Sequence, residues 1–148
     1  GSESDFWFGN LNSDFSKKEN MADAQLNKMA VSGIDPQPMS KENPWYKYYS
    51  FLPKEESVDD GNMIQTDSKN YEANPFGLFS MHGNIAEWTR SSYVPYPYKD
   101  KSKVSSEYKV VRGGSYIDRP KFSTSYERKA YYPWQRVHNV GFRVIIED

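Results

Sequence analysis

The residues whose types are best suited to chemistry or ligand binding lie between Asn74 and Trp88, in the stretch NPFGLFSMHGNIAEW. Gly83-Asn84 is a turn signal, and a short strand is expected directly after it. Alternation along that strand would place Glu87 on the same face as Ile85, where an unpaired carboxylate is costly. Glu87 therefore needs a partner. The ordinary structural solution is an arginine or backbone N–H groups, and the alternative is a hard cation such as calcium, bound with the turn carbonyls of Gly83 and Ile85.

A second group of oxygen-bearing side chains is the sequence Asp59-Asp60-Gly61-Asn62. Two carboxylates, a glycine and an amide in succession can wrap around calcium, but the same residues also form ordinary exposed turns. The stretch lacks the acidic residue that closes an EF-hand loop, so that calcium-binding fold is excluded. From the residues alone, both the metal site and the turn remain open.

Residue types that support other chemistry are scarce or absent. The chain has no cysteine, which excludes disulfides, thiolate metal sites and thiol nucleophiles. Its histidines are His82 and His138, and a histidine in a turn is more often a hydrogen-bonding surface residue than a metal ligand. Acid–base hydrolysis through Asp118 and Arg119 is conceivable, but such a pair is usually a structural salt bridge.

Length and composition indicate a single domain, residues 1–148, with a real core. The formal net charge is −1, which argues against a nucleic-acid partner. Aromatic residues make up 16% of the chain while mean hydropathy is low, so large amphipathic rings are expected to fill the core of a loop-rich domain. No apolar run is long enough to cross a bilayer. Gly1-Ser2 is interpreted as a tag remnant, so the natural N-terminus and any signal peptide cannot be read here.

The elements expected around these residues are short. Phe6–Gly9 should form a buried strand or turn, and Ser16–Ala30 only a weak helix. Prolines among the rings of Val31–Pro53 predict an ordered loop. The remaining expectations are an extended arm over Tyr93–Tyr98, a charged excursion over Lys99–Glu107, a strand over Tyr108–Arg112 and a last, central strand over Gly141–Ile146.

Several motifs in a fixed order resemble the formylglycine-generating enzyme family, also called sulfatase-modifying factor domains. They are FWFGN, NPFGLFSMHGNIAEW, KVVRGGSYIDR, a segment with Arg128 and Ala130 before Pro133, and GFRV near the C-terminus. The resemblance implies an α+β fold of the C-type-lectin-like kind, with short β-strands, few helices and much ordered loop. It does not extend to the family's N-terminal half, so the chain is similar to the C-terminal portion of a family member.

The resemblance also implies two structural calcium ions. The first would be bound by the side chain of Asn20, the carbonyl of Met21, the carboxylate of Asp60 and the carbonyl of Asn62. The second would be bound by Ser80, the carbonyls of Gly83 and Ile85, and Glu87. Ser80 departs from the family's usual Asn or Asp, and a neutral hydroxyl is a weaker calcium ligand, so the second site is expected to be weakened or filled by water.

The family's named activity converts a sulfatase cysteine to formylglycine with a pair of copper-binding cysteines. Those positions fall here on Asp118 and on Ser123 or Thr124. Copper(I) selects soft sulfur ligands, which a carboxylate and a hydroxyl cannot replace, so neither copper nor oxidase activity is expected. The alternative is an enzyme of the family with altered, non-thiol chemistry, such as the non-haem iron type, although that type needs more histidine than this chain carries.

The preferred interpretation is a binding or assembly module. Aromatic and arginine side chains are typical interface anchors, and the expected recognition surface comprises Asp118, Arg119, Tyr126, Arg128, Tyr132 and Trp134. For half of these rings, core packing is at least as good an explanation. A protein or glycan partner is expected, and half a lectin-like core would expose strand edges that invite homodimerisation or pairing with a missing N-terminal half.

The two arginines that flank the strands have a structural interpretation. Arg112 and Arg143 are assigned to buried ion pairs with Glu87 or Asp118 rather than to a ligand. A hypervariable ligand-binding protein of the lectin-like type is a third functional alternative. The family resemblance favours an extracytoplasmic location, in the periplasm or cell envelope.

Overall fold

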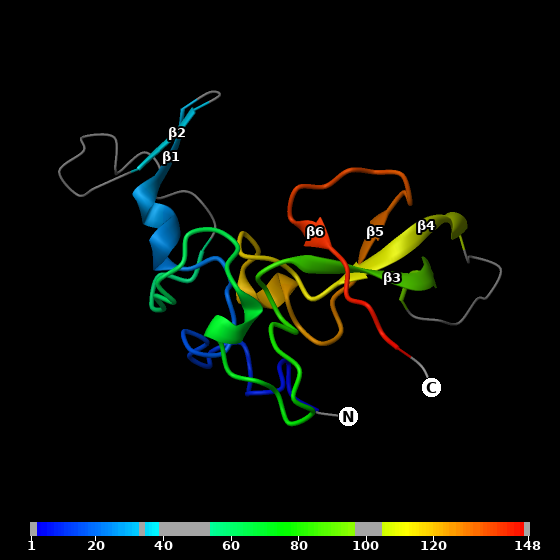
Figure 1. The fold of residues 1–148 in the computed structure, drawn as a ribbon, viewed down its shortest axis with the longest axis horizontal. Helices are drawn as coiled ribbons and strands as arrows, with labels where there is room; N and C mark the ends of the chain where they lie inside the picture. The colour runs from blue at the N-terminus through cyan, green and yellow to red at the C-terminus, as the bar shows by residue number, and fades with distance from the viewer. Residues whose placement is uncertain (1–2, 33–34, 39–53, 97–104, 147–148) are drawn as a thin grey trace.

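The computed structural model describes residues 3–32, 35–38, 54–96 and 105–146. Short strands and 3-10 helices are joined there by long loops (Figure 1). In chain order the elements are η1 (Ala24–Lys28), β1 (Met29–Ser32), β2 (Asp35–Pro38), η3 (Ser68–Asn70), β3 (Ala86–Tyr93), β4 (Ser105–Arg112), η5 (Pro120–Phe122), β5 (Lys129–Tyr131) and β6 (Val140–Gly141). In these ranges no helix is long and apolar enough to cross a membrane.

A four-stranded sheet with the order β5-β4-β3-β6 is the largest regular unit. β3 and β4 run antiparallel with Glu87 opposite Arg112, and β4 pairs antiparallel with β5. β6 runs parallel to β3, with Val140 opposite Ala86. Because β3 begins where β4 ends, the turn before β3 and the turn after β4 are neighbours, and the polar side chains of both turns meet at this end of the sheet.

The last strand differs from the prediction in both length and position. The apolar run Gly141–Ile146 predicts a central strand, but only Val140–Gly141 joins the sheet, at its edge. Beyond it, Phe142 is 77% exposed and Ile146 is 87% exposed. An apolar run indicates that burial is favourable without saying which neighbour provides it, and among the described residues no strand lies outside β6.

Most other predicted elements exist with different bounds. Phe6–Gly9 forms a tight turn in which the Phe6 N–H donates to the Gly9 carbonyl at 2.9 Å. The weak helix expected within Ser16–Ala30 is only the 3-10 helix η1. Strand β4 begins at Ser105, so the end of the predicted charged excursion belongs to the sheet. Tyr93, the first residue of the predicted extended arm, is likewise the last residue of β3.

The proline-rich segment lies only partly within the described residues. Where a loop was expected, β2 pairs antiparallel with β1 in a separate two-stranded sheet. Each strand of such a sheet has one unpaired edge, and an edge tolerates Pro36 and Pro38, which have no N–H to donate. Residues 39–53 lie outside the described residues, so the loop predicted there stays a prediction.

The buried core beside the sheet is formed largely by loop residues, as the aromatic-rich composition predicted. Its members are Phe6, Phe15, Met21 and Val58, with Phe8 packed against them. Phe6 stacks on Phe8 with ring centroids 5.0 Å apart, and the His82 ring meets Phe6 edge-on at 5.1 Å. These contacts attach the N-terminal loops to the turn that precedes β3.

That turn depends on a glycine at close backbone approach. Gly83 has φ +85°, and a Cβ built on it would lie 2.1 Å from the Asn20 carbonyl oxygen. The Gly83 N–H donates to the Gly113 carbonyl at 2.7 Å, and the Asn84 N–H donates to the Asn20 carbonyl at 2.6 Å. Only a residue without a side chain fits between these two backbones.

Replacing Gly83 should therefore destabilise the fold far more than replacing another glycine of the same backbone conformation. We expect Gly83→Ala to lower the free energy of unfolding by more than about 3 kcal/mol, because strain adds to a backbone clash. Gly77 is the matched control: its φ is +76° and a Cβ added there would meet no atom within 4 Å. Gly77→Ala should cost only about 1–2 kcal/mol. Equal losses for the two variants in urea denaturation would contradict the packing argument.

Candidate functional site

The Glu87 carboxylate is bound by the Arg143 guanidinium at the start of β3. Arg143 Nε lies 3.1 Å from Oε1 and 3.2 Å from Oε2, and Nη2 lies 2.8 Å from Oε1. The same Nη2 donates to the Phe79 carbonyl at 2.8 Å. The two side chains are half-buried, so this forked pair is partly shielded from water. The arginine partner expected for Glu87 is thereby confirmed.

Residues of the second predicted calcium site surround the same ion pair. Ser80, Ile85 and Glu87 line a cavity of about 240 Å³, with Arg143 also in its wall. The Ser80 backbone is left-handed, with φ 49°, and its carbonyl accepts from Arg143 Nη2 at 3.5 Å. Because the guanidinium already neutralises Glu87, the charge balance favours the arginine over a divalent cation. Calcium at Ser80, Gly83, Ile85 and Glu87 stays a prediction.

The first predicted calcium site contains buried oxygens that lack donors. Asn20 and Asp60 lie in segments that run side by side: the Asp60 N–H donates to Asp23 Oδ2 at 2.5 Å, and the Asn20 amide donates to the Ile64 carbonyl at 2.9 Å. In the part of the chain that the structure describes, Asn20 Oδ1 and Asp60 Oδ2 are buried without a hydrogen-bond partner. Such orphaned oxygens suit a hard cation, which would complete their coordination.

Electrostatics at Asp60 agree with that fit. Burial raises the pKa of the Asp60 carboxyl to about 7. Its Oδ1 accepts from the Asn62 N–H at 2.7 Å, and the Asn62 amide donates to the Tyr71 hydroxyl at 2.8 Å. A bound cation would favour the charged form of the carboxyl. Among the described residues no group of three or more His, Cys, Asp or Glu side chains is arranged to hold a metal ion, so a cation here would rely on amide and carbonyl oxygens as well.

The position of the family's first cysteine holds a carboxylate whose oxygens are both engaged. Asp118 Oδ1 lies 2.6 Å from Lys129 Nζ, and the Ser115 hydroxyl donates to Asp118 Oδ2 at 2.6 Å. The Asn139 amide donates to the Ser115 hydroxyl at 2.7 Å. The salt bridge of Asp118 is thus made with Lys129 and not with the adjacent Arg119.

The two candidates for the second cysteine position are packed. Ser123 and Thr124 are buried, and within the described residues neither hydroxyl has a hydrogen-bond partner. The Ser123 carbonyl lies 2.7 Å from His82 Nδ1.

His82 is itself buried, contrary to the surface position expected for it, and burial lowers its pKa. The turn before β3 is folded into the core, which turn residues alone do not reveal; His138 is exposed as expected.

Besides Asp118, the residues predicted to form a recognition surface take part in three sets of contacts. Arg119 lies over the Phe122 ring. Arg128 lies over the Tyr96 ring, 3.9 Å from its centroid, while the Tyr126 hydroxyl donates to Asp5 Oδ1 at 3.0 Å. Tyr132 and Trp134 stack on one another. Their proximity in the sequence predicted a single surface and did not show that the side chains make different contacts.

The predicted ion pair of Arg112 is wrong. The sheet register places Arg112 opposite Glu87, yet the Glu87 carboxylate contacts Arg143 instead. Arg112 Nη2 donates to the carbonyl of Ser125, in the loop after η5. Opposite positions in a sheet bring backbones together, but the direction of each long side chain is decided by its other neighbours.

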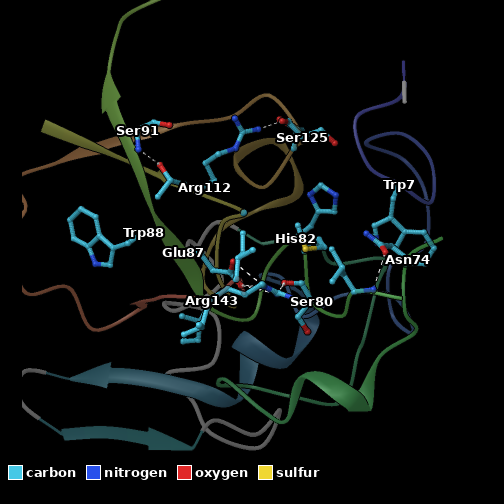
Figure 2. A pocket seen from close by; sticks show the side chains of 18 of the residues that line it. Trp7, Asn74, Ser80, His82, Glu87, Trp88, Ser91, Arg112, Ser125 and Arg143 are labelled. Carbon is cyan, nitrogen blue, oxygen red and sulfur yellow. Dashed lines mark hydrogen bonds and ion pairs between the residues drawn. The ribbon is translucent and has the colours of Figure 1, made fainter. Parts of the chain in front are cut away.

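A larger cavity, of about 1100 Å³, opens beside the Glu87–Arg143 pair (Figure 2). In the close view the Glu87–Arg143 pair lies between Trp88 on one side and His82 with Trp7 on the other, and Arg112 reaches toward Ser125. Both charges and apolar surface face this space. Its lining includes two residues of the exposed C-terminal segment, Val144 and Ile145.

One buried carboxyl near this cavity was not singled out from the sequence. Trp7, which lines the cavity, donates from Nε1 to Glu19 Oε1 at 2.9 Å. Glu19 is fully buried and burial raises its pKa to about 8. Within the described residues its Oε2 has no hydrogen-bond partner. The available signal was the Glu19-Asn20 pair after FWFGN, which marks the resemblance without revealing burial.

Comparisons with known proteins agree with the family that the motifs indicate. The family described as "Sulfatase-modifying factor enzyme 1-like domain" matches residues 11–148. The chain belongs to this family. A formylglycine-generating enzyme from Streptomyces coelicolor is 28% identical over 101 residues, which cover 62% of this chain and 32% of that enzyme.

Two solved structures are similar to this member of the family. PvdO from Pseudomonas aeruginosa matches with a TM-score of 0.51 and 22% identity over 82% of this chain and 50% of PvdO. Treponema denticola variable protein 1 matches with a TM-score of 0.49 and 24% identity, over 57% of this chain and 32% of that chain. The likeness to PvdO shows a shared fold. This chain spans about a third of the length of the Streptomyces relative and half that of PvdO.

Proposed function

We propose that this domain is a binding and assembly module of the sulfatase-modifying factor family and does not act as a copper oxidase. The proposal includes the C-type-lectin-like form of the fold, with which the short strands and long ordered loops are consistent. The observation that carries it is the apolar segment after β6. Its large side chains are exposed, and among the described residues no further strand pairs with this edge of the sheet. The chemistry at the family's cysteine positions supports the loss of oxidase activity.

The donor set at those positions does not suit copper. Asp118 gives hard oxygens that already contact Lys129 and Ser115, and an ammonium group 2.6 Å away opposes a second positive charge. Ser123 and Thr124 offer only neutral hydroxyls inside a packed region. Copper(I) in proteins prefers thiolate and thioether ligands, and the chain has no cysteine.

The expected outcome of an oxidase assay is therefore no product. The chain is incubated with copper, oxygen and a Cys-x-Pro-x-Arg peptide, and mass spectrometry is used to detect formylglycine. The Streptomyces coelicolor enzyme serves as the positive control under the same conditions. Catalytic turnover by this chain would contradict the proposal and favour an enzyme with altered chemistry.

The segment after β6 has the character of a protein-binding surface. Phe142, Val144, Ile145 and Ile146 are all at least 74% exposed, and they continue directly from an edge strand. Contiguous exposed apolar residues beside an unpaired strand edge favour pairing with another polypeptide. The family relatives extend well beyond the matched part. We therefore assign this surface to a polypeptide carrying the remaining portion of the family fold, in the same or another chain.

Without that partner the apolar segment should bind a second copy. We expect concentration-dependent self-association in sedimentation velocity, and a Phe142→Ser, Ile146→Ser variant should weaken it by at least about tenfold, because two large apolar contacts are lost. Phe76→Ser is the matched control, since Phe76 is as exposed as Ile146, at 87%, but lies outside the segment. A chain that stays monomeric at all concentrations, or an equal effect of both variants, would argue against this surface.

Calcium is the second part of the proposal, at the first predicted site. The orphaned oxygens of Asn20 and Asp60 fit a hard cation, which the carbonyls of Met21 and Asn62 would help to bind. A bound ion would cross-link the N-terminal loop and the loop before η3, and so stabilise the fold around the turn at Gly83.

Chelation should lower the melting temperature by roughly 5–10 °C if calcium is near saturation, given about 2.7 kcal/mol of binding stabilisation at a hundredfold excess over Kd. Asp60→Asn should abolish the calcium response because it removes the charged ligand. Glu87→Gln is the control that separates the two predicted sites, and it should leave the response intact. An unchanged melting temperature in EDTA would rule out structural calcium. Loss of the calcium response only in Glu87→Gln would show that the ion binds at the second predicted site instead.

A further inference from the structure

Three aromatic rings lie against one another at the β4–β5 edge of the sheet. The Tyr108 and Tyr132 ring centroids are 4.4 Å apart with planes tilted by 35°, and those of Tyr132 and Trp134 are 5.0 Å apart with planes 13° from parallel. The register pairs Lys109 with Tyr131, so one further step places Tyr108 opposite Tyr132. The sheet thus positions the two inner rings, and Trp134 extends the stack outward.

The outer ring is fixed in place yet open to solvent. Trp134 is 76% exposed although its ring stacks on Tyr132. The turn that carries it is closed by the Gln135 N–H, which donates to the Tyr132 carbonyl at 2.9 Å. Tryptophan is highly buried in most folded proteins, so an exposed but ordered indole indicates a binding role.

The stack also offers hydrogen-bond donors at its side. The Tyr108 hydroxyl donates to the Tyr132 hydroxyl at 2.7 Å. In the part of the chain that the structure describes, the Tyr132 hydroxyl proton and the Trp134 indole N–H have no acceptor. Both donors are therefore available to a molecule that lies on the indole.

We propose that Trp134, supported by Tyr132 and Tyr108, is a carbohydrate-binding platform that stacks on one face of a pyranose ring. The C–H groups of that face suit the electron-rich face of an indole, and the hydroxyls around the sugar's rim suit the neighbouring donors. The inference rests on the proposed function as a binding module and adds a ligand class and a site. It uses a surface distinct from the apolar segment after β6.

The surroundings of Trp134 suit a sugar better than a protein partner. A stable protein interface needs about 800 Å² on each partner, with few charges at its centre. The exposed neighbours of Trp134 in the chain are Pro133, Arg136 and His138, two of them polar. The large exposed aliphatic side chains cluster instead after Gly141. One fixed ring face with polar neighbours is sufficient for a pyranose.

The test uses the whole chain with cellopentaose, xylopentaose, mannopentaose and chitopentaose. Saturation-transfer NMR and calorimetry should detect binding of at least one of them with a Kd of about 1 mM or tighter. Trp134→Ala should weaken that binding by at least about tenfold, while Trp134→Phe keeps a ring face and should retain part of it. Tyr132→Phe, which removes only the hydroxyl, should cause a smaller loss of about threefold.

Two controls make each outcome decisive. Melting curves show whether Trp134→Ala is folded, and Ile146→Ser should reduce self-association without changing sugar binding. No binding of any of the four sugars at about 10 mM overturns the inference, as does binding that Trp134→Ala leaves unchanged. If sugar binding fails while self-association persists, the binding-module proposal stands without this site. If Ile146→Ser abolishes sugar binding, the site belongs to the C-terminal segment and the inference is wrong.

Discussion

The approach of the Gly83-Asn84 turn to the backbone at Asn20 is the contact on which the described structure depends. Through it, hydrogen bonds join the N-terminal loop, the start of β3 and the end of β4 without an intervening helix. A backbone pressed this closely leaves no room for a side chain at Gly83. The same close approach places the turn inside the fold. His82, beside the turn, is therefore buried, and its ring contacts Phe6 of the aromatic core.

Three carboxylates near this contact differ in how their charge is balanced. Glu87 has Arg143, and Asp118 has Lys129, so each is neutralised by a cation of the chain. Asp60 accepts a backbone N–H at one oxygen, while its other oxygen lacks a donor among the described residues. The proposed calcium ion would balance the charge of Asp60, whereas the other two carboxylates have their charge balanced within the fold.

The two surfaces assigned to binding lie on different segments of the chain. The loop between β5 and β6, which carries Tyr132 and Trp134, arches above the strands, whereas the segment after β6 descends toward the C-terminus (Figure 1). One surface is a single fixed ring with polar neighbours and the other is a run of exposed aliphatic and aromatic side chains. Because their chemistry differs, we expect that the proposed sugar on the first and the proposed polypeptide on the second would not compete.

The sequence by itself determined the family, the loop-rich class of fold and the absence of thiol chemistry, and it favoured an arginine as the partner of Glu87 without selecting Arg143. Ordered motifs, residue types and local turn signals carry that information because they act over a few neighbouring residues. It did not determine that Gly141–Ile146 leaves the sheet, that Arg112 contacts Ser125, or that Tyr108 joins Tyr132 and Trp134 in one stack. These depend on which distant segments meet, and only the tertiary structure decides whether an apolar run is covered and which way a long side chain turns.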